Sequence, residues 1–428
     1  MTLASRPVSR FRITPRIPGD KSITHRAWLI GALAEGETRV RGWNPGADCA
    51  ATLRAVQQLG VKVRREEKDI VLEGSGGKLR APAGPLDLGN SGTGLRLLLG
   101  VLAGQPFPVE LAGDESLNRR PVERVLAPLR EMGATATTEG DHPPVFLAGG
   151  VLHGLEYTLP VPSAQAKSAI LLAGIQARGE TRVHGGGASR DHTERMLRAF
   201  SVPVEGMGDE VWLRGPATPR ARPVNIPGDP SAATFYLVAA AIAPGSEVVL
   251  EGVGLNPLRI KAFEVLERMG LSLERIQEGG GEEPEGRVNV RGRSLRGLVI
   301  ESEEVSGLID ELPALAVAAA FAEGVTTVRG AGELKVKESD RLATVAEGLR
   351  AIGAKVTLHE DGWTIEGSGG EPLPGGEVMS RGDHRVAMAF LIAGLGCLGG
   401  VRIGDNPMIE TSDPLFLENL NSILDGGT

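Results

Sequence analysis

Apolar segments recur along the chain at intervals of about 70 residues. Each follows a short polar turn and is apolar nearly all round, which predicts a buried helix. A glycine and a short β-branched strand come next in each copy. The six predicted buried helices cover Ala27–Leu33, Leu95–Leu102, Ala169–Ile175, Phe235–Ile242, Leu312–Phe321 and Val386–Leu398. The strands that follow them include Thr38–Val40, Val109–Leu111, Thr181–Val183, Glu247–Leu250, Thr326–Val328 and Val401–Ile403.

A second helix with a 3.6-residue apolar stripe follows in each copy and is expected to face solvent on one side. Most of these helices end at a glycine, which suits the left-handed conformation at a helix C-terminus. The clear cases are Leu53–Val63, Val122–Ala134, Phe263–Leu271 and Val345–Val356. The third copy has Phe200-Ser201 at this point, and the sixth runs into the C-terminal segment Leu415–Leu424. Each copy therefore reads as a βαβαββ unit.

The tetrapeptide Ile17-Pro18-Gly19-Asp20 recurs as Ile226-Pro227-Gly228-Asp229. If these two turns are where the chain crosses between halves, each half holds three copies. We therefore predict an α/β protein with two lobes, one formed by residues 20–227 and the other by residues 228–428 completed by 1–19. A double crossover acts as a hinge, so the lobes are expected to close on a ligand. The competing interpretation is a structural repeat array that binds without chemistry.

The chain carries 46 Lys and Arg against 54 Asp and Glu, a net charge of −8, which argues against nucleic acid or an anionic membrane as a partner. Its two cysteines, Cys49 and Cys397, have no metal-binding spacing and suit a reducing compartment. The N-terminal stretch lacks the apolar region of a secretory signal. These features predict a cytoplasmic protein without a metal site.

The start of the first buried helix gathers groups that bind anions. Asp20 and Ser22 are both suitable N-cap residues, and a helix N-terminus attracts negative charge. Lys21 lies in the first turn, where a cation is slightly unfavourable for the helix, and Arg26 lies one turn after Ser22. This stretch therefore predicts a pocket for a phosphorylated or carboxylated ligand.

Other helix starts in the first half carry similar chemistry. The glycines of Gly89-Asn90-Ser91-Gly92-Thr93-Gly94 allow close approach of a small ligand. Arg120 precedes Pro121 and suits bidentate recognition of a carboxylate or phosphate, whereas Arg119 is expected on the surface. The segments Ser163-Ala164-Gln165 and Ser189-Arg190 add hydroxyl, amide and cationic groups. Ser163 and Ser189 taken singly could each be simple N-caps.

The second half places acids beside cations. Asp310-Glu311 opens an otherwise apolar helix, where one acid can satisfy the helix dipole and a carboxylate beside a ligand hydroxyl can act as a general base. The segment Lys335–Arg341 holds five charged residues, a pattern most typical of a solvated loop. The last buried helix opens with Asp383-His384-Arg385.

Taken together, these motifs resemble those of the 3-phosphoshikimate 1-carboxyvinyltransferases, also called EPSP synthases, over essentially the whole chain. The resemblance implies a fold of two lobes with three βαβαββ units each. It implies transfer of the enolpyruvyl group of phosphoenolpyruvate to the 5-hydroxyl of shikimate 3-phosphate, with release of phosphate and no metal or organic cofactor. The product, 5-enolpyruvylshikimate 3-phosphate, leads to chorismate and the aromatic amino acids.

The resemblance also implies roles for individual residues. Shikimate 3-phosphate would contact Lys21, Ser22, Arg26, Ser163, Ala164, Gln165, Ser189, Arg190, Asp310 and Lys337. Phosphoenolpyruvate would contact Lys21, Gly92, Arg120, Gln165, Arg341 and Arg385. The catalytic groups would be Asp310 as the base for the 5-hydroxyl, Glu338 as the acid for the methylene carbon, and Lys21. Small-molecule substrates and a monomeric state are expected.

Some positions depart from the commoner pattern of the family. Ala164, His192 and Thr411 stand where many members have Ser, Tyr and Lys; the Ala-Gln-x-Lys form and the Thr occur in a second branch. Gly92 leaves room for the inhibitor glyphosate, while Thr411 removes a cation from the same region. The alternatives are the related transferase acting on UDP-N-acetylglucosamine, whose loop cysteine has no counterpart here, and a non-catalytic anion-binding protein.

Overall fold

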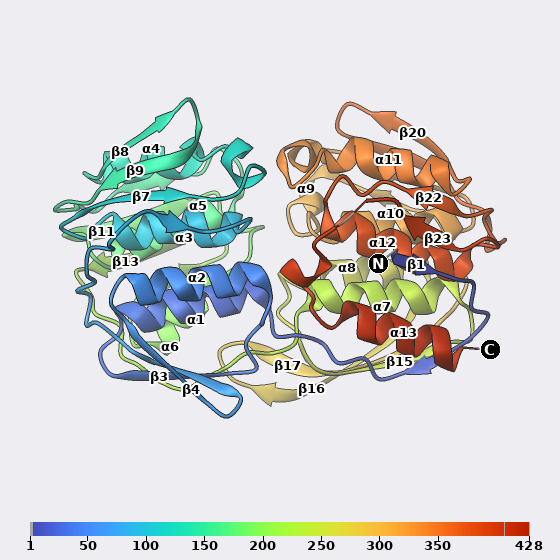
Figure 1. Ribbon diagram of the computed structural model, residues 1–428, viewed down its shortest axis with the longest axis horizontal. Helices are drawn as coiled ribbons and strands as arrows, with labels where there is room; N and C mark the ends of the chain where they lie inside the picture. The colour runs from blue at the N-terminus through green and yellow to red at the C-terminus, as the bar shows by residue number, and fades with distance from the viewer. Residues whose placement is uncertain (1–2, 406, 428) are drawn as a thin grey trace. The chain divides into compact units, whose positions relative to one another are not determined.

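The computed structural model describes residues 3–405 and 407–427. The chain divides into two units, Gly19–Ile226 and a second unit that joins Met1–Pro18 to Pro227–Thr428. Each unit has a hydrophobic core of its own. Helices and small mixed sheets build both units (Figure 1), so the predicted α/β fold class is confirmed.

The unit Gly19–Ile226 contains three four-stranded sheets, with strand orders β14-β3-β5-β4, β6-β7-β9-β8 and β10-β11-β13-β12. Its strands are β3 (Glu37–Arg41), β4 (Lys62–Glu66), β5 (Asp69–Glu73), β6 (Leu86–Asp87), β7 (Pro108–Ala112), β8 (Thr135–Glu139), β9 (His142–Ala148), β10 (Glu156–Thr158), β11 (Gly179–His184), β12 (Val204–Met207), β13 (Glu210–Gly215) and β14 (Val224–Asn225). Its helices are α1 (Lys21–Leu33), α2 (Ala47–Gln58), α3 (Gly92–Leu102), α4 (Glu123–Glu131), α5 (Ala164–Gly174) and α6 (His192–Ala199).

The second unit contains two four-stranded sheets, β16-β17-β15-β2 and β18-β19-β21-β20, and the three-stranded sheet β1-β23-β22. Its strands are β1 (Leu3–Ser5), β2 (Arg12–Ile13), β15 (Glu247–Gly254), β16 (Ser272–Gly280), β17 (Pro284–Arg291), β18 (Val299–Ile300), β19 (Val325–Val328), β20 (Lys355–His359), β21 (Gly362–Glu366), β22 (Gly376–Val378) and β23 (Val401–Ile403). Its helices are α7 (Pro230–Ile242), α8 (Lys261–Met269), α9 (Ser302–Val305), α10 (Leu312–Phe321), α11 (Arg341–Ala351), α12 (His384–Ala393) and α13 (Phe416–Gly426).

The pairing of two short strands closes each unit on itself. β2 comes just before α1 in the chain, yet it pairs with β15 of the second unit. β14 comes just before α7, yet it pairs in parallel with β3 near the start of the unit Gly19–Ile226. The first and last segments of Gly19–Ile226 are therefore hydrogen-bonded to each other within that unit.

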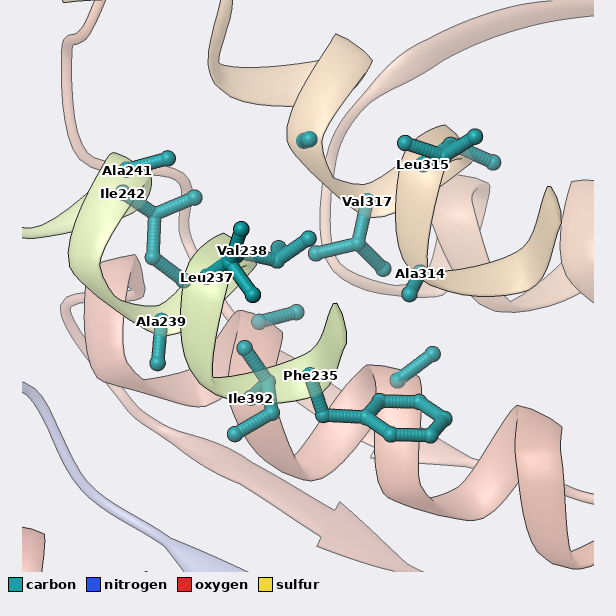
Figure 2. Packing of buried hydrophobic residues seen from close by; sticks show 14 of the residues in the cluster. Phe235, Leu237, Val238, Ala239, Ala241, Ile242, Ala314, Leu315, Val317 and Ile392 are labelled. Carbon is teal, nitrogen blue, oxygen red and sulfur yellow. The ribbon is translucent and has the colours of Figure 1, made fainter. Parts of the chain in front are cut away.

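The predicted all-round burial of the first helix in each copy is confirmed. All residues of α7, α10 and α12 are buried, and these three helices pack on one another (Figure 2). In Figure 2 Phe235 and Val238 of α7 lie among the apolar side chains Val317 of α10 and Ile392 of α12. In the other unit α1 contacts α2 and α3, and α3 contacts α5 (Figure 1).

Several predicted helix boundaries are wrong by a turn or more. The last buried helix, predicted to reach Leu398, ends at Ala393, because a 3₁₀ turn over Gly394–Gly396 replaces it. The second helix of the first copy begins at Ala47 and ends at Gln58 rather than covering 53–63. The glycines placed after these second helices do adopt positive φ, for example 88° at Gly60 and 110° at Gly133.

Ser201 holds the equivalent position in the third copy and has φ of 63°, although it is not a glycine. A side chain in this left-handed region costs the folded state roughly 1–2 kcal/mol. Glycine removes this cost, but part of the gain is lost because glycine makes the unfolded chain more flexible. We therefore expect Ser201→Gly to raise the free energy of unfolding by about 0.5–1 kcal/mol in urea denaturation. Ala50→Gly, inside α2 of the same unit, serves as the control and is expected to lower it by about 1 kcal/mol. Destabilisation by both glycines would contradict the prediction.

Candidate active site

The starts of the buried helices in the unit Gly19–Ile226 are capped by side chains. Asp20 accepts a hydrogen bond from the Ile23 amide at 2.9 Å, and Ser91 accepts one from the Gly94 amide at 3.1 Å. Ser163 caps α5 through the Ala166 amide at 3.3 Å. Such a start still presents amide groups and the positive end of a helix dipole, a combination that binds anions.

Lys21 is partly buried in the first turn of α1, and its ammonium donates to Asp48 Oδ2 at 2.8 Å. Asp48 belongs to α2 and was not singled out from the sequence. Ser22 Oγ accepts from Arg190 Nη1 at 3.4 Å, so these two predicted ligand groups lie together. Burial lowers the pKa of His25 far below its ordinary value, and Lys21 adds to this effect. The neutral imidazole therefore adds no charge beside Lys21.

Arg26 is 2% exposed and connects three helices. Its guanidinium donates to the Ser22 carbonyl at 2.8 Å, to Ser168 Oγ at 2.7 Å and to Thr193 Oγ1 at 2.7 Å. These contacts tie α1 to α5 and α6. In this structure Arg26 thus holds the helix starts together, and its predicted contact with a ligand stays a prediction.

Gly92 is the first residue of α3 and lies against two arginines. A Cβ added there would be 2.8 Å from Arg96 Nη1 and 3.2 Å from Arg120 Nη1, so glycine is what permits this approach. Arg120 Nη2 donates to Asn90 Oδ1 at 2.6 Å, which fixes the guanidinium beside the glycine-rich turn. Arg119 is exposed and pairs with Glu115 at 2.7 Å, as expected of a surface charge.

The start of α5 lies beside the start of α3. Gln165 Nε2 donates to Thr93 Oγ1 at 3.0 Å, which places Ser163, Ala164 and Gln165 near Gly92. Ser189 is buried, and its hydroxyl donates to the Gly186 carbonyl at 2.6 Å. The structure therefore gives two groups of predicted residues in this unit: Ser22, Arg26 and Arg190 near the start of α1, and Gly92, Arg120 and Gln165 at the starts of α3 and α5.

In the second unit Arg341 lies beside three acidic side chains. It is 1% exposed, its Nε donates to Asp383 Oδ2 at 2.8 Å, and its Nη2 donates to Glu338 Oε2 at 2.6 Å. Asp310 Oδ1 lies 3.7 Å from Arg341 Nη1 and 3.5 Å from Arg385 Nε. Burial disfavours the charge of Arg341, yet Asp383, Glu338 and Asp310 together raise its pKa above the ordinary value.

The two neighbouring acids Asp310 and Glu311 have different environments. Glu311 is buried, accepts a hydrogen bond from Ser231 and lies 3.5 Å from Arg259 Nη1. Arg259 also donates to Asp229 Oδ1 at 2.7 Å. The Asp310 side chain is partly exposed and faces Arg341 and Arg385. Asp310 is therefore the acid of this pair that remains accessible to a ligand, while Glu311 belongs to a buried network that sequence spacing did not indicate.

The comparisons with known proteins agree with this geometry. The family model described as EPSP synthase (3-phosphoshikimate 1-carboxyvinyltransferase) matches residues 6–420. The chain belongs to the EPSP synthase family.

Relatives named 3-phosphoshikimate 1-carboxyvinyltransferase come from several bacteria. The one from Acidithiobacillus ferrooxidans is 50% identical over 415 residues, covering 96% of this chain and 95% of the relative. The one from Shouchella clausii is 48% identical over 413 residues and covers 95% of each chain. Family membership confirms the prediction of an enzyme, and neither the UDP-N-acetylglucosamine transferase nor the non-catalytic anion-binding protein is favoured.

Solved structures support the EPSP synthase fold. The chain is similar to EPSP synthase from Acinetobacter baumannii with a TM-score of 0.86 and 43% identity, covering 100% of this chain and 98% of that one. The enolpyruvyl transferase NikO from Streptomyces tendae has a TM-score of 0.77 over 98% and 96% of the two chains. Its 19% identity shows a shared fold only.

Lys337 adds a cation to the second unit. It is partly buried in the turn between the 3₁₀ segment Gly332–Val336 and α11. Burial lowers the pKa of Lys337 below its ordinary value, although Glu333, Asp310 and Glu338 act in the opposite direction. In the charged segment 335–341 Lys335, Val336 and Asp340 are exposed, as in a solvated loop, whereas Arg341 is buried and faces Asp310.

Further expectations concern metal sites, membrane-spanning helices and the cysteines. Among residues 3–405 and 407–427, no three His, Cys, Asp or Glu side chains are grouped so as to hold a metal ion. No helix in that described part of the chain is long and apolar enough to cross a membrane. Cys49 and Cys397 are both buried free thiols, and burial raises the pKa of Cys397 to about 12.

Asp413 is a buried acid that the sequence did not reveal. It is 1% exposed, its Oδ1 accepts from the Leu415 amide at 3.0 Å, and its Oδ2 has no hydrogen-bond partner among the described residues. Burial raises the pKa of Asp413 from 3.8 to about 7; the hydrogen bond from Leu415 opposes this shift and the charge of Asp229 adds to it.

This shift predicts a pH-dependent stability. Between pH 3.8 and about 7 the folded protein keeps a proton that the unfolded chain has released. The contribution of Asp413 is therefore fully present below pH 3.8 and is lost as pH rises to about 7, at up to about 1.4 kcal/mol per pH unit. We expect Asp413→Asn to lack this component in urea denaturation at a series of pH values. Asp425→Asn, at an exposed position of α13, should follow the wild type; parallel curves for all three proteins would refute the assignment.

Proposed function

We propose that this enzyme transfers the carboxyvinyl group of phosphoenolpyruvate to the 5-hydroxyl of 3-phosphoshikimate and releases phosphate. The observation that carries the proposal is the grouping of Asp310 and Glu338 around Arg341 and Arg385, with Lys337 beside them. Both carboxylates face Arg341, and Asp310 also faces Arg385. Two carboxylates suit a base and an acid, and the cations suit anionic substrates. The family name supports the same substrate.

In the proposed reaction, Asp310 accepts the proton of the 5-hydroxyl while the oxygen of that hydroxyl bonds to C2 of phosphoenolpyruvate. Glu338 gives a proton to the methylene carbon C3, which forms a tetrahedral adduct. Glu338, now a carboxylate, takes a proton back from the new methyl group while phosphate leaves with the proton held by Asp310, and the vinyl ether forms. The proposal includes no metal or organic cofactor.

We assign the ligand groups as the resemblance to the family implies. Residues of α1, α5 and the turn before α6 would hold 3-phosphoshikimate together with Asp310 and Lys337; they are Lys21, Ser22, Arg26, Ser163, Ala164, Gln165, Ser189 and Arg190. Phosphoenolpyruvate would contact Lys21, Gly92, Arg120, Gln165, Arg341 and Arg385. The close approach of Arg96 and Arg120 to Gly92 supports an anion site there. We also propose that glyphosate fits at this place, because Gly92 leaves room for it.

The residue ranges assigned to the two ligands follow the two units. Residues 20–227 would supply most groups for 3-phosphoshikimate, and residues 228–428 with 1–19 would supply the acid and base. We also propose that the enzyme acts as a cytoplasmic monomer on these small molecules. Light scattering after gel filtration tests the monomer, and a mass of twice that of the chain would contradict it.

Release of phosphate from phosphoenolpyruvate tests the function directly. We expect release only when 3-phosphoshikimate is present, with a product whose mass equals that of the acceptor plus one carboxyvinyl group. UDP-N-acetylglucosamine is the matched alternative acceptor. Phosphate release with that sugar nucleotide and none with 3-phosphoshikimate would overturn the proposal.

A further inference from the structure

Lys167 is a buried lysine at the start of α5 that has no place in the proposed chemistry. Its side chain is 2% exposed, and it follows Ser163-Ala164-Gln165 by less than one turn. An ammonium group removed from water is costly unless each of its N–H groups finds an acceptor. The contacts of Lys167 therefore indicate what this position requires.

The ammonium of Lys167 has three acceptors. Nζ lies 2.6 Å from Glu194 Oε1 on α6, 3.3 Å from the Gly186 carbonyl and 3.4 Å from the Ser189 carbonyl. Three N–H donors thus face three oxygens. Two of these oxygens belong to the turn between β11 and α6, so the lysine fastens this turn to α5.

The fastened turn carries two predicted ligand groups. The Gly186 carbonyl also accepts from the Ser189 amide at 2.9 Å and from Ser189 Oγ at 2.6 Å, so Lys167 and Ser189 meet at one oxygen. The next residue, Arg190, reaches Ser22 Oγ at the start of α1. A Cβ at Gly186 would lie 2.8 Å from Lys167 Cδ, which shows how closely the turn lies on the lysine stem.

Glu194 depends on the same lysine. Its side chain is 5% exposed, and its Oε2 has no hydrogen-bond partner within residues 3–405 and 407–427. Beside this pair, Thr193 donates to Ser168 Oγ at 2.6 Å, and both hydroxyls accept from Arg26. The contact between α5 and α6 is therefore polar, and Arg26 connects it to α1.

We infer that Lys167, supported by Glu194, is a positioning residue that fixes Ser189 and Arg190 for the phosphate group of 3-phosphoshikimate. This inference rests on the proposed function. The three N–H groups of Lys167 all face protein oxygens, so none is left for a ligand. Lys167 holds the 186–190 turn in one conformation, with Ser189 on the Gly186 carbonyl and Arg190 beside Ser22, so the turn is ordered before the phosphate binds.

The inference predicts a loss that is specific for the phosphate. The test variant is Lys167→Met with Glu194→Leu, because replacing a buried ion pair by apolar side chains commonly preserves stability, whereas Lys167→Met alone leaves a buried carboxylate unpaired. We expect KM for 3-phosphoshikimate to rise about tenfold, the equivalent of one charge-assisted hydrogen bond. We expect kcat and KM for phosphoenolpyruvate to stay within about twofold of the wild type.

Shikimate without the phosphate provides the readout that a merely structural role would not change. Its inhibition constant against 3-phosphoshikimate should be the same in the wild type and the double variant, so the preference for the phosphorylated compound falls about tenfold. Lys62→Met with Glu73→Leu removes an exposed ion pair of the same unit and should change none of these values.

The outcomes separate this inference from the proposed function. An unchanged preference for 3-phosphoshikimate in the double variant, or an equal loss for shikimate and for phosphoenolpyruvate, would overturn the role of Lys167 while wild-type turnover stands. A wild type that shows no turnover with 3-phosphoshikimate would overturn both. Unfolding curves of the double variant that match the wild type show that a changed preference is not due to partial unfolding.

Discussion

Glu338→Gln is expected to lose turnover by about a thousandfold while both substrates still bind. Glutamine keeps the shape of the side chain and an oxygen that can accept from Arg341 Nη2, which lies 2.6 Å from Glu338 Oε2. It cannot give a proton to carbon, so only the proton-transfer step is removed. Steady-state phosphate release measures turnover, and calorimetry measures the affinity for 3-phosphoshikimate.

Asp340→Asn is the matched control for this experiment. Asp340 is an exposed N-cap of α11, two residues from Glu338, and its Oδ1 accepts from the Ala343 amide at 3.1 Å. Asparagine caps a helix as well as aspartate does, so activity should stay within about twofold. Turnover of Glu338→Gln close to that of the wild type would remove Glu338 from the catalytic groups.

Arg341→Lys is expected to raise KM for phosphoenolpyruvate by about a hundredfold. The guanidinium binds Asp383 through Nε and Glu338 through Nη2 at the same time, while Nη1 faces Asp310. An ammonium keeps the charge but cannot reproduce this fork or bind a carboxylate or phosphate through two N–H groups. The loss of one hydrogen bond between charged groups, at most about 3 kcal/mol, accounts for an effect of about this size. Initial rates at varied phosphoenolpyruvate measure it.

Arg350→Lys on the same helix is the comparison for this second variant. Arg350 is exposed, and it donates to the Val356 carbonyl at 3.2 Å. Its replacement by lysine should leave KM for phosphoenolpyruvate within about twofold of the wild type. Arg341→Lys itself should leave the affinity for 3-phosphoshikimate nearly unchanged. An equal loss of affinity for both substrates would show that Arg341 acts through the general fold rather than at one ligand.

The helix starts could be read from the sequence because their signals are local. Asp20 before Lys21 and Ser163 before Ala164 are cap residues placed directly before buried helices, and the structure shows their hydrogen bonds. The repeated glycines after the second helices were equally local signals, and Gly270 with φ of 112° is one of them. Local chemistry of this kind depends only on neighbours in the chain.

The partners of these groups could not be read from the sequence, since they come from distant segments. Asp48 for Lys21, Glu194 for Lys167 and Arg259 for Glu311 lie 27 or more residues away, and no spacing rule links them. The same holds for Asp413, whose environment is created by burial at the start of α13 rather than by any neighbour in sequence. Tertiary packing, not propensity, decides which of two adjacent acids is sequestered.

The parallel pairing of β14 with β3 has a consequence for the modularity of the chain. The Ile226 amide donates to the Arg41 carbonyl at 3.0 Å, and a Cβ built on Gly19 would lie 1.8 Å from the Gly42 carbonyl oxygen, so both ends of the segment Gly19–Ile226 lie against residues 41–42. On the other side of the two connections, the Asp229 amide donates to the Pro18 carbonyl at 2.8 Å. Removing the segment Gly19–Ile226 would therefore leave the two ends of the second unit close enough for a few residues to join them. The segment Gly19–Ile226 thus has the arrangement of a domain inserted into another domain.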